Sequence, residues 1–492
     1  VMASISPSPS PASSGGYLVY SGATDFSLIG RNAPPAGGKG GASKKGGASK
    51  KGAAAASPAV GGPGTPELRA FHRLGSFSAQ KLSLVASGTA ACHGILVNEN
   101  GEAFAFGRNE AGQCGITPPC AQISTPFNLS KHYSALIGKK KVVAAACGKH
   151  HTVLVTEDGC AYACGSNKMG QCGLGGKVDT PKSQKAGADS EKPVELKQCD
   201  IQEEVVSVAC GADFTMFVTK NGQLYACGSP QYGQLGNGTD GSFNSSASSI
   251  KMVFEPFPKP TRVYQGFGTE KVIGVACGHN HSIAITDAGH AYTWGFGGYG
   301  RLGHKEQKDE MTPRRLETFT NRFVLPDNGK SCRMACGQTF SLITAFGGQL
   351  YVFGKPKATG DNIMYPKPLM EISGWTMRSI ACGATHTVAC SEKSTIAWGS
   401  SQYGECAFGA GGPKSSANPK LVDDAEGLVA NSCAAGTGLS MVLMNDPVDK
   451  FPLYEPPEDT PDVSAPTGAG AKRKTPASKA EPAQKKGKKA AK

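Results

Sequence analysis

Cysteine and histidine are the residue types in this 492-residue chain that could bind metal, form disulfides or act as nucleophiles. Seventeen cysteines are present, and most of them recur at fixed places in a repeated pattern. Because they alternate with leucine or tryptophan at those places, and no paired C-x-x-C spacing occurs, the pattern argues against zinc and against disulfides. We expect reduced cysteines that fill the core as small apolar residues. One repeat position alone holds Cys147, Cys210, Cys277, Cys336 and Cys382.

Histidines also recur at one repeat position. His151, His281 and His386 occupy it, and His93 lies close to it in the first repeat. Their order in the chain gives no Ser-His-Asp or Cys-His arrangement, so we predict no catalytic residue, no metal ligand and no cofactor. Two roles stay open for these histidines. A structural imidazole bonded to blade backbone is favoured over a residue that faces a partner at the rim of the fold.

A glycine signature, G-x-x-x-x-G-x-x-G, marks the elements that must position these residues. It occurs at residues 107–115, 165–173, 228–236 and 295–303, with a weaker copy at 399–407. Two short apolar runs joined by a glycine turn precede each signature, which is the pattern of a β-hairpin. Repeats of four short strands cannot bury both faces of a sheet alone, so they predict an all-β propeller.

The number of repeats predicts seven blades and a closed ring. The seventh first half ends at Met444 without a signature, whereas an unpaired signature half occurs at residues 17–30. We predict that these two halves join into one blade and leave no open sheet edge. The predicted parts are a disordered segment at 1–15, an N-terminal half-blade at 16–35, a disordered Lys/Gly/Ala-rich loop at 36–66, the seven-bladed propeller at 67–445 and a disordered basic tail at 446–492.

These repeats resemble those of the regulator of chromosome condensation family. Four longer runs carry the resemblance beyond the shared glycines: residues 22–31, 295–311, 364–367 and 374–383. The resemblance covers about residues 16–445. It implies a propeller that associates with chromatin and the spindle in mitosis and that binds a small GTPase of the Rac or Ran type. Relatives that act on Ran catalyse guanine-nucleotide exchange, whereas the longer runs are most similar to a branch that acts as a mitotic scaffold.

The net charge of +13 resides in two segments of the chain. Residues 36–66 carry five lysines and no acidic residue, and residues 463–492 carry nine basic residues and one acidic residue, which together account for the whole +13. Flexible lysine clusters bind polyanions by counterion release. They predict contacts with chromatin, nucleic acid or microtubules, and the alternative is a solubilising role. The first segment includes Lys44, Lys45, Lys50 and Lys51.

The second basic segment has the spacing of a bipartite nuclear import signal. Its two clusters are Lys472, Arg473 and Lys474, followed by Lys485, Lys486, Lys488 and Lys489. Two short cationic clusters on an extended linker match two acidic grooves of an import carrier. We therefore expect a nuclear protein, found on chromosomes or in the nucleolus and at the spindle or centromere in mitosis. No apolar run reaches the roughly 18 residues that a membrane span needs.

The longest insertion between repeats, residues 237–271, carries four aromatic residues: Phe254, Phe257, Tyr264 and Phe267. They could cover the propeller face, or they could form a hot spot for a protein partner.

Three functions compete. The favoured function is a non-catalytic nuclear and mitotic scaffold that binds chromatin or spindle components and a small GTPase. The second is a guanine-nucleotide exchange factor for a Ran- or Rac-type GTPase. The third is a light sensor like the plant ultraviolet-B photoreceptor, which needs stacked tryptophans, and only Trp294, Trp375 and Trp398 are present.

Overall fold

The computed structural model describes residues 15–29, 67–176, 192–244, 252–319, 331–345, 348–357 and 359–457. The chain divides into two compact units, Val1–Pro461 and Asp462–Lys492, and the second lies outside the described residues. Within the described residues nearly all regular structure is antiparallel β-sheet. The α-helices there are single turns, α1 (Leu129–His132) and α2 (Ser134–Ile137), too short to span a membrane.

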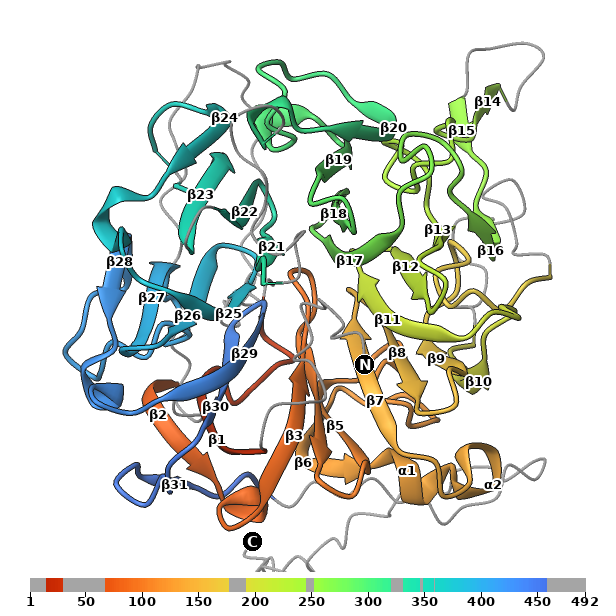
Figure 1. Cartoon of the computed structure of the whole chain (residues 1–492). Coiled ribbons are helices and arrows are strands. Elements are labelled where there is room, and N and C mark those ends of the chain that lie inside the picture. Colours follow the sequence, from red (N-terminus) through yellow and green to blue (C-terminus); the bar gives the residue numbers. More distant parts are fainter. Residues whose placement is uncertain are drawn as a thin grey trace, which may run out of the picture. The chain divides into compact units, whose positions relative to one another are not determined.

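Seven four-stranded blades surround a common axis in the first unit, as the sequence predicted (Figure 1). From the axis outward, the blades have the following strands. Blade 1 is β3 (Lys81–Ala86), β4 (His93–Asn98), β5 (Ala103–Arg108) and β6 (Gln122–Asn128), and blade 2 is β7 (Val142–Cys147), β8 (His151–Thr156), β9 (Ala161–Gly165) and β10 (Val194–Gln198). Blade 3 is β11 (Val205–Cys210), β12 (Phe214–Thr219), β13 (Leu224–Gly228) and β16 (Phe257–Arg262), with the hairpin β14 (Ser242–Asn244) and β15 (Met252–Phe254) inserted before its outer strand. Blade 4 is β17 (Val272–Cys277), β18 (His281–Thr286), β19 (Ala291–Gly295) and β20 (Glu310–Arg315), and blade 5 is β21 (Met334–Cys336), β22 (Phe340–Ala345), β23 (Gln349–Gly354) and β24 (Ile363–Pro368). Blade 6 is β25 (Met377–Cys382), β26 (His386–Ser391), β27 (Thr395–Ser400) and β28 (Ser415–Leu421), and blade 7 is β29 (Ala430–Gly436), β30 (Leu439–Met444), β1 (Gly16–Gly22) and β2 (Leu68–Leu74).

Blade 7 combines strands from both ends of the described chain and closes the ring. β1 pairs with β30 in an unbroken antiparallel register from Tyr17 opposite Met444 to Gly22 opposite Leu439. The predicted joining of the two half-blades is therefore confirmed. The propeller resumes at β2 within the predicted range 67–445, and β2 pairs with β1 as the outer strand of the same blade. The segment 36–66 therefore falls between the third and fourth strands of blade 7.

The chain beyond residue 445 also belongs to the propeller, so the predicted start of the tail at residue 446 is wrong. The side chains of Val448 and Phe451 are buried, and the Phe451 ring packs edge-on against Phe71 of β2 at 6.1 Å between centroids. β31 (Leu453–Tyr454) then pairs in parallel with β2 and lies beside it in Figure 1. Covering the outer edge of β2 protects a strand that would otherwise be open to pairing.

The signature glycines allow the backbone of one blade to lie directly against the outer strand of the next blade. A Cβ on Gly170 of blade 2 would lie 2.4 Å from Pro258 Cα in the outer strand of blade 3, and its φ is +77°. A Cβ on Gly404 of blade 6 would lie 2.7 Å from Arg69 Cα in the outer strand of blade 7. Only glycine permits this backbone approach, which explains why the signature repeats.

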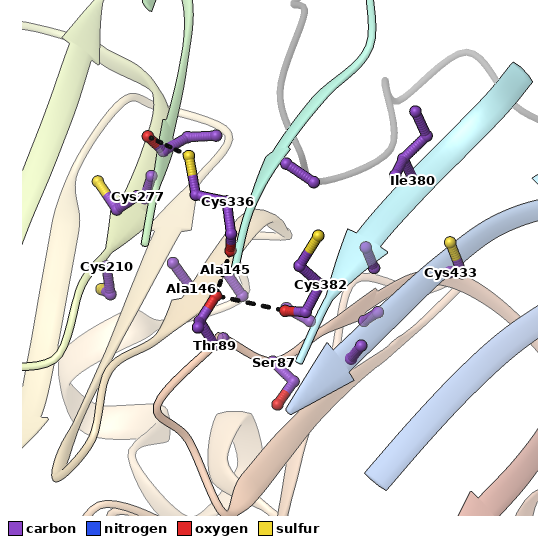
Figure 2. Close-up of a pocket in the computed structure, with 18 of the residues that line it drawn as sticks. Ser87, Thr89, Ala145, Ala146, Cys210, Cys277, Cys336, Ile380, Cys382 and Cys433 are labelled. Carbon is purple, nitrogen blue, oxygen red and sulfur yellow. Dashed lines mark hydrogen bonds between the residues drawn. The ribbon is translucent and has the colours of Figure 1, made fainter. Parts of the chain in front are cut away.

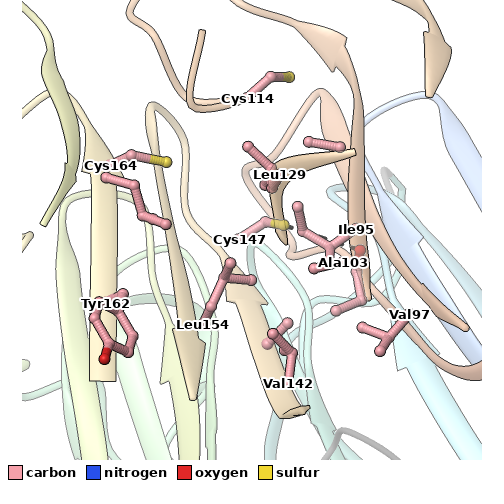
Figure 3. Close-up of a cluster of buried hydrophobic side chains, with 14 of the residues drawn as sticks. Ile95, Val97, Ala103, Cys114, Leu129, Val142, Cys147, Leu154, Tyr162 and Cys164 are labelled. Atoms are coloured by element: carbon pink, nitrogen blue, oxygen red, sulfur yellow. Dashed lines mark hydrogen bonds between the residues drawn. The ribbon is translucent and has the colours of Figure 1, made fainter. Parts of the chain in front are cut away.

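The cysteines fill the core between blades, as predicted. All seventeen are unpaired, and all are buried except the partly buried Cys120 and Cys160. Figure 3 shows Cys114, Cys147 and Cys164 among apolar side chains between blades 1 and 2. Burial raises the pKa of most of these thiols, so they stay protonated at neutral pH. Among the described residues, no group of three or more His, Cys, Asp or Glu residues is placed to hold a metal ion.

Candidate interaction face at the propeller axis

One face of the propeller carries the loops that hold the glycine signatures. In every blade the turn between the first and second strands emerges at the same end as the loop that follows the third strand, because the strands alternate in direction. We call this end the signature face, since the glycine signatures lie on it. The turns nearest the axis form a turn ring, made of residues 87–92, 148–150, 211–213, 278–280, 337–339, 383–385 and 437–438.

Backbone hydrogen bonds join neighbouring turns of this ring. The Lys149 N–H donates to the Ala212 carbonyl at 3.0 Å, and the Ala212 N–H donates to the His279 carbonyl at 3.1 Å. Equivalent bonds join blade 5 to blade 6 and blade 7 to blade 1. The ring therefore presents its side chains from a fixed backbone, which is a favourable property for recognising a partner.

Polar atoms of the turn ring are buried without partners. Both ring nitrogens of His279 and the Nδ1 atom of His150 make no hydrogen bond within the described part of the chain. Burial, together with the nearby Lys149 ammonium, lowers the pKa of each of these histidines to about 4, so both imidazoles are neutral at pH 7. Burial raises the pKa of Asp213 on the turn between them. Unsatisfied buried groups cost stability, and a bound partner could supply the missing hydrogen bonds.

The four histidines at the shared repeat position are structural, but their partner differs from the one expected. Each imidazole bonds a hydroxyl group in the next blade, not its own backbone: His93 to Thr152, His151 to Thr215, His281 to Ser341 and His386 to Ser440, at 2.7–2.9 Å. At most 1% of each histidine is exposed, which excludes a partner-facing role at the rim.

The direction of these bonds fixes the histidine tautomer. The hydroxyls of Thr152, Thr215 and Ser341 donate to carbonyls of the preceding signature loops at 2.6–2.9 Å. Each hydroxyl must therefore accept from the imidazole, so Nε2 carries the hydrogen. Protonation of Nδ1 would leave a buried charge with no partner. Desolvation accordingly lowers the pKa of His93 and of His151 to about 3.

A threonine lies across the axis itself. The turn of blade 1 is longer than the others, and its Thr89 hydroxyl donates to the carbonyl of Cys336 in blade 5 at 2.5 Å and approaches that of Cys382 in blade 6 at 3.3 Å. Figure 2 shows this hydroxyl between the two carbonyls. The cavity that they line at the axis has a volume of about 80 Å³. The turn is pressed against blade 2, because a Cβ on Gly88 would lie 1.9 Å from the Cys147 carbonyl oxygen. Thr89 thus connects blade 1 to the opposite side of the ring.

The four aromatic residues of the predicted hot spot do not lie on one exposed surface. Phe267 is buried, with its ring 5.0 Å from Tyr292, and Phe257 packs partly against the same core because it begins the outer strand of blade 3. Phe254 is half-buried in the inserted hairpin, and Tyr264 is 71% exposed beneath the Arg262 guanidinium. The insertion is shorter than expected, since residues 257–262 belong to a blade. Two of the four aromatic residues therefore serve the core.

The other predicted binding residues are the lysines and arginine of the two basic segments. They lie outside the described residues: Lys44, Lys45, Lys50, Lys51, Lys472, Arg473, Lys474, Lys485, Lys486, Lys488 and Lys489. Sequence reasoning missed the turn-ring residues instead. The sequence signal that could have identified them is the variable position just before the shared histidine position, where the repeats carry His150, Asp213 and Asn280.

The fold and its repeats define a class of protein. Residues 73–444 match the RCC1-like domain, and the chain belongs to that family of chromosome condensation regulators. Within it, the chain is similar to Protein RCC2 of Homo sapiens, with 33% identity over 458 residues that cover 90% of this chain and 80% of the human protein. It is 33% identical to the Protein RCC2 homolog of Danio rerio over 90% of this chain and 84% of that one.

Solved structures share the fold at lower identity. Yeast RCC1 (Prp20), in a structure bound to Kap60, superposes with a TM-score of 0.62 and 18% identity, over 91% of this chain and 92% of that chain. Human WBSCR16 superposes with a TM-score of 0.64 and 19% identity, over 88% of this chain and 100% of that chain. At these identities the likeness establishes the propeller and not its partners.

Proposed function

We propose that this chain is a non-catalytic nuclear and mitotic scaffold whose propeller binds a small GTPase of the Rac or Ran type through the turn ring. The observation that carries the proposal is the set of buried, unpartnered imidazole nitrogens of His150 and His279 on a fixed backbone. Rotation of the half-buried His150 and His279 side chains would bring these nitrogens to a partner, which would then supply the missing hydrogen bonds while the backbone of the ring stays fixed. Support also comes from a solved relative, Prp20p, whose structure was reported with its binding properties to Gsp1p and histones.

Guanine-nucleotide exchange is the alternative. A rigid face that presses on a GTPase would favour release of its nucleotide, and the turn ring has that rigidity. The two functions differ in one measurable property, since a scaffold binds the GTPase and leaves the nucleotide in place.

The test uses Rac- and Ran-type GTPases loaded with a fluorescent guanine nucleotide. We expect the full chain to bind one of them without accelerating nucleotide release. We expect His279→Ala and Asp213→Ala to weaken binding about tenfold. Lys220→Ala is the matched control, because Lys220 lies in a turn at the opposite end of blade 3 and pairs with Glu204. Faster nucleotide release at micromolar protein would support the exchange factor, and unchanged binding by the turn-ring variants would reject this face.

We further propose that the two basic segments bind chromatin, nucleic acid or microtubules and that the second is bound by a nuclear import carrier. The segments contain all of the net positive charge of the chain, which supports polyanion binding. A fluorescent fusion in which Lys472, Arg473 and Lys474 are alanine should remain in the cytoplasm in interphase. Nuclear accumulation equal to that of the unchanged chain would contradict the import signal.

A further inference from the structure

The signature loop of blade 4, residues 296–309, departs from the pattern of the other blades. In blades 1, 2 and 3 a glutamine after the second signature glycine accepts the N–H of the residue two positions earlier. Blade 4 has Arg301 at that position. The corresponding Tyr299 N–H is bonded instead by Gln307 from farther along the loop, at 3.0 Å. The Arg301 side chain therefore does not take part in this turn and makes other contacts.

Arg301 contacts two aromatic rings of its own loop, and a third ring from blade 3 packs beside them. Its guanidinium lies 4.5 Å from the centroid of the Phe296 ring and 5.5 Å from that of Tyr299, and it donates to the Gln338 carbonyl of blade 5 at 2.7 Å. The Tyr232 ring of blade 3 lies 4.8 Å from Phe296. We call Tyr232, Phe296 and Tyr299 the aromatic platform. Arg301 is only 3% exposed, so it supports the platform from beneath.

The blade 4 loop that carries Phe296 and Tyr299 is held in one conformation. The Gly297 N–H donates to Asp309 Oδ1 at 2.8 Å, and the Lys305 N–H donates to the Met364 carbonyl at 2.8 Å. Among the described residues, non-glycine residues with positive φ are Tyr299, Lys305 and Ala407, and two of these three lie in this loop. Such strain persists only where the surroundings impose it, and it concentrates at ligand-binding segments.

The lysines around the platform have no acidic partner. Lys305, Lys308 and Lys355 form no ion pair with any carboxylate of the described residues, and the Lys355 ammonium lies 5.5 Å from the Tyr299 ring. The nearby acidic groups are already engaged, since Glu306 and Glu310 both pair with Arg314. Asp309 accepts the Gly297 N–H. The platform is thus a rigid aromatic surface with uncompensated positive charge.

We propose that the aromatic platform is a docking site for an acidic segment of a protein partner. Carboxylates of the segment would pair with Lys355 and its neighbours, and an apolar side chain would pack on Tyr299, which is 41% exposed. Single-stranded nucleic acid fits less well, because it needs successive free ring faces. Arg301 stacks on Phe296 and Tyr232 lies beside it, which leaves Tyr299 as the exposed ring. The proposal goes beyond GTPase binding, since any protein that carries such a segment would satisfy it.

The test measures binding of a fluorescein-labelled twelve-residue peptide of glutamate and leucine to the full chain by anisotropy at physiological salt. We expect Lys355→Glu to weaken binding about tenfold, whereas Lys220→Glu, the same charge change at the opposite end of blade 3, weakens it less than about twofold. Because both variants lower the net charge equally, binding by the basic segments affects them alike. Equal weakening by the two variants would overturn the proposal.

A second variant separates binding from folding. Tyr299→Gly keeps the positive φ but relieves its strain, and it removes the ring, so we expect an equal or higher melting temperature and about a tenfold loss of peptide affinity. Unchanged affinity in this variant would contradict the platform. A labelled twelve-nucleotide thymidine strand serves as the competing ligand, and if Tyr299→Gly and Lys355→Glu weaken that strand while leaving the peptide unaffected, the site binds nucleic acid and the proposal is wrong.

Discussion

Glu405 directly follows Gly404, the second signature glycine of blade 6. Blades 1, 2 and 3 carry glutamine at this position, and Glu405 makes the same bond, accepting the Tyr403 N–H at 2.7 Å. It is 3% exposed, and burial raises the pKa of its carboxyl to about 7. Glu67 and Arg69, at the start of the outer strand of blade 7, act on that pKa in opposite directions. An ionisable group therefore lies buried at the interface between blades 6 and 7, and we call such an interface between neighbouring blades a seam.

Replacing Glu405 by glutamine should remove a pH dependence of stability. Because the folded pKa is raised above the ordinary value of 4.5, the unfolded chain loses this proton first as pH rises. Stability contributed by the group is complete below about pH 4.5 and falls until pH 7, by up to about 3 kcal/mol. Chemical denaturation of both proteins at pH 5 and pH 8 checks this. We expect Glu405→Gln to be more stable at pH 8 by about 1–3 kcal/mol and to show little advantage at pH 5, and an equal difference at both pH values would contradict the assignment.

The repeat position that His281 shares with three other histidines allows a second prediction at the residue scale, because other repeats carry a different residue there. Blades 3 and 5 carry Phe214 and Phe340 where blade 4 carries His281. His281→Phe should therefore cost only about 1 kcal/mol, the bond to Ser341 being lost without an unfilled space. His281→Ala should cost about 3 kcal/mol, since it also leaves a cavity between blades. Thermal and urea unfolding measure both, and an equal cost for the two variants would show that packing at this site is unimportant.

At the scale of the element, the seams between blades are not equivalent. The seam between blades 5 and 6 has neither a histidine–hydroxyl bond, because Phe340 replaces the histidine, nor a complete glycine signature. Lys357 of blade 5 bonds the side chain of Asn418 in the outer strand of blade 6, at an exposed site. Thr89 reaches this seam from the other side of the axis, where its one hydroxyl hydrogen is shared between the Cys336 carbonyl of blade 5 and the more distant Cys382 carbonyl of blade 6. We infer that the long turn of blade 1 compensates for what this seam lacks.

Thr89→Val tests that inference because valine preserves the shape and removes the hydroxyl. It leaves two carbonyls with one donor fewer, so we expect a loss of about 1–3 kcal/mol. We also expect faster amide exchange in β21 and β25, with little change in β8 and β12 on the far side. Thr385→Val, at an exposed position of the blade 6 turn, is the control. Uniformly faster exchange in all blades would indicate a general loss of stability and would contradict a local role at this seam.

At the scale of the whole molecule, the sequence was sufficient to predict the ring and its closure. The repeated glycines and apolar runs report local geometry, and a repeat unit that cannot bury its own faces has few alternatives to a propeller. The outer strands were harder to place, because β2 and β16 carry proline or charged residues and no signature. The segment 446–457 was also missed, since Val448 and Phe451 are isolated apolar residues in a polar stretch.

The candidate sites were less predictable than the fold. Aromatic type alone placed Phe267 in a hot spot, yet burial against Tyr292 and Trp294 makes it a core residue. The turn ring depends on side chains from different blades that approach one another only at the axis. No local pattern encodes that proximity. Repeat alignment identifies the equivalent positions, but the three-dimensional ring is needed to show which polar atoms lack partners.

The segment after blade 7 supplies a prediction at this largest scale. Phe451→Ala should destabilise the propeller by about 3 kcal/mol, because the ring is buried against Phe71 beside the closing strands. Leu453→Ala, two residues away and 48% exposed, should change stability by less than about 0.5 kcal/mol. Thermal unfolding curves of the two variants and of the unchanged chain measure both effects. Similar effects of the two variants would show that the segment contributes through backbone pairing alone.

The register of β1 against β30 joins residues about 420 positions apart, and this has a consequence for biosynthesis. While the ribosome is still translating blades 1 to 6, β1 can pair with β2 but not with β30, and the ring has no complete last blade. The circle can close only after the final strands have left the exit tunnel. A message truncated before β30 begins at Leu439 would therefore yield an unclosed chain with one edge of β1 unpaired, which chaperones and proteases are suited to recognise.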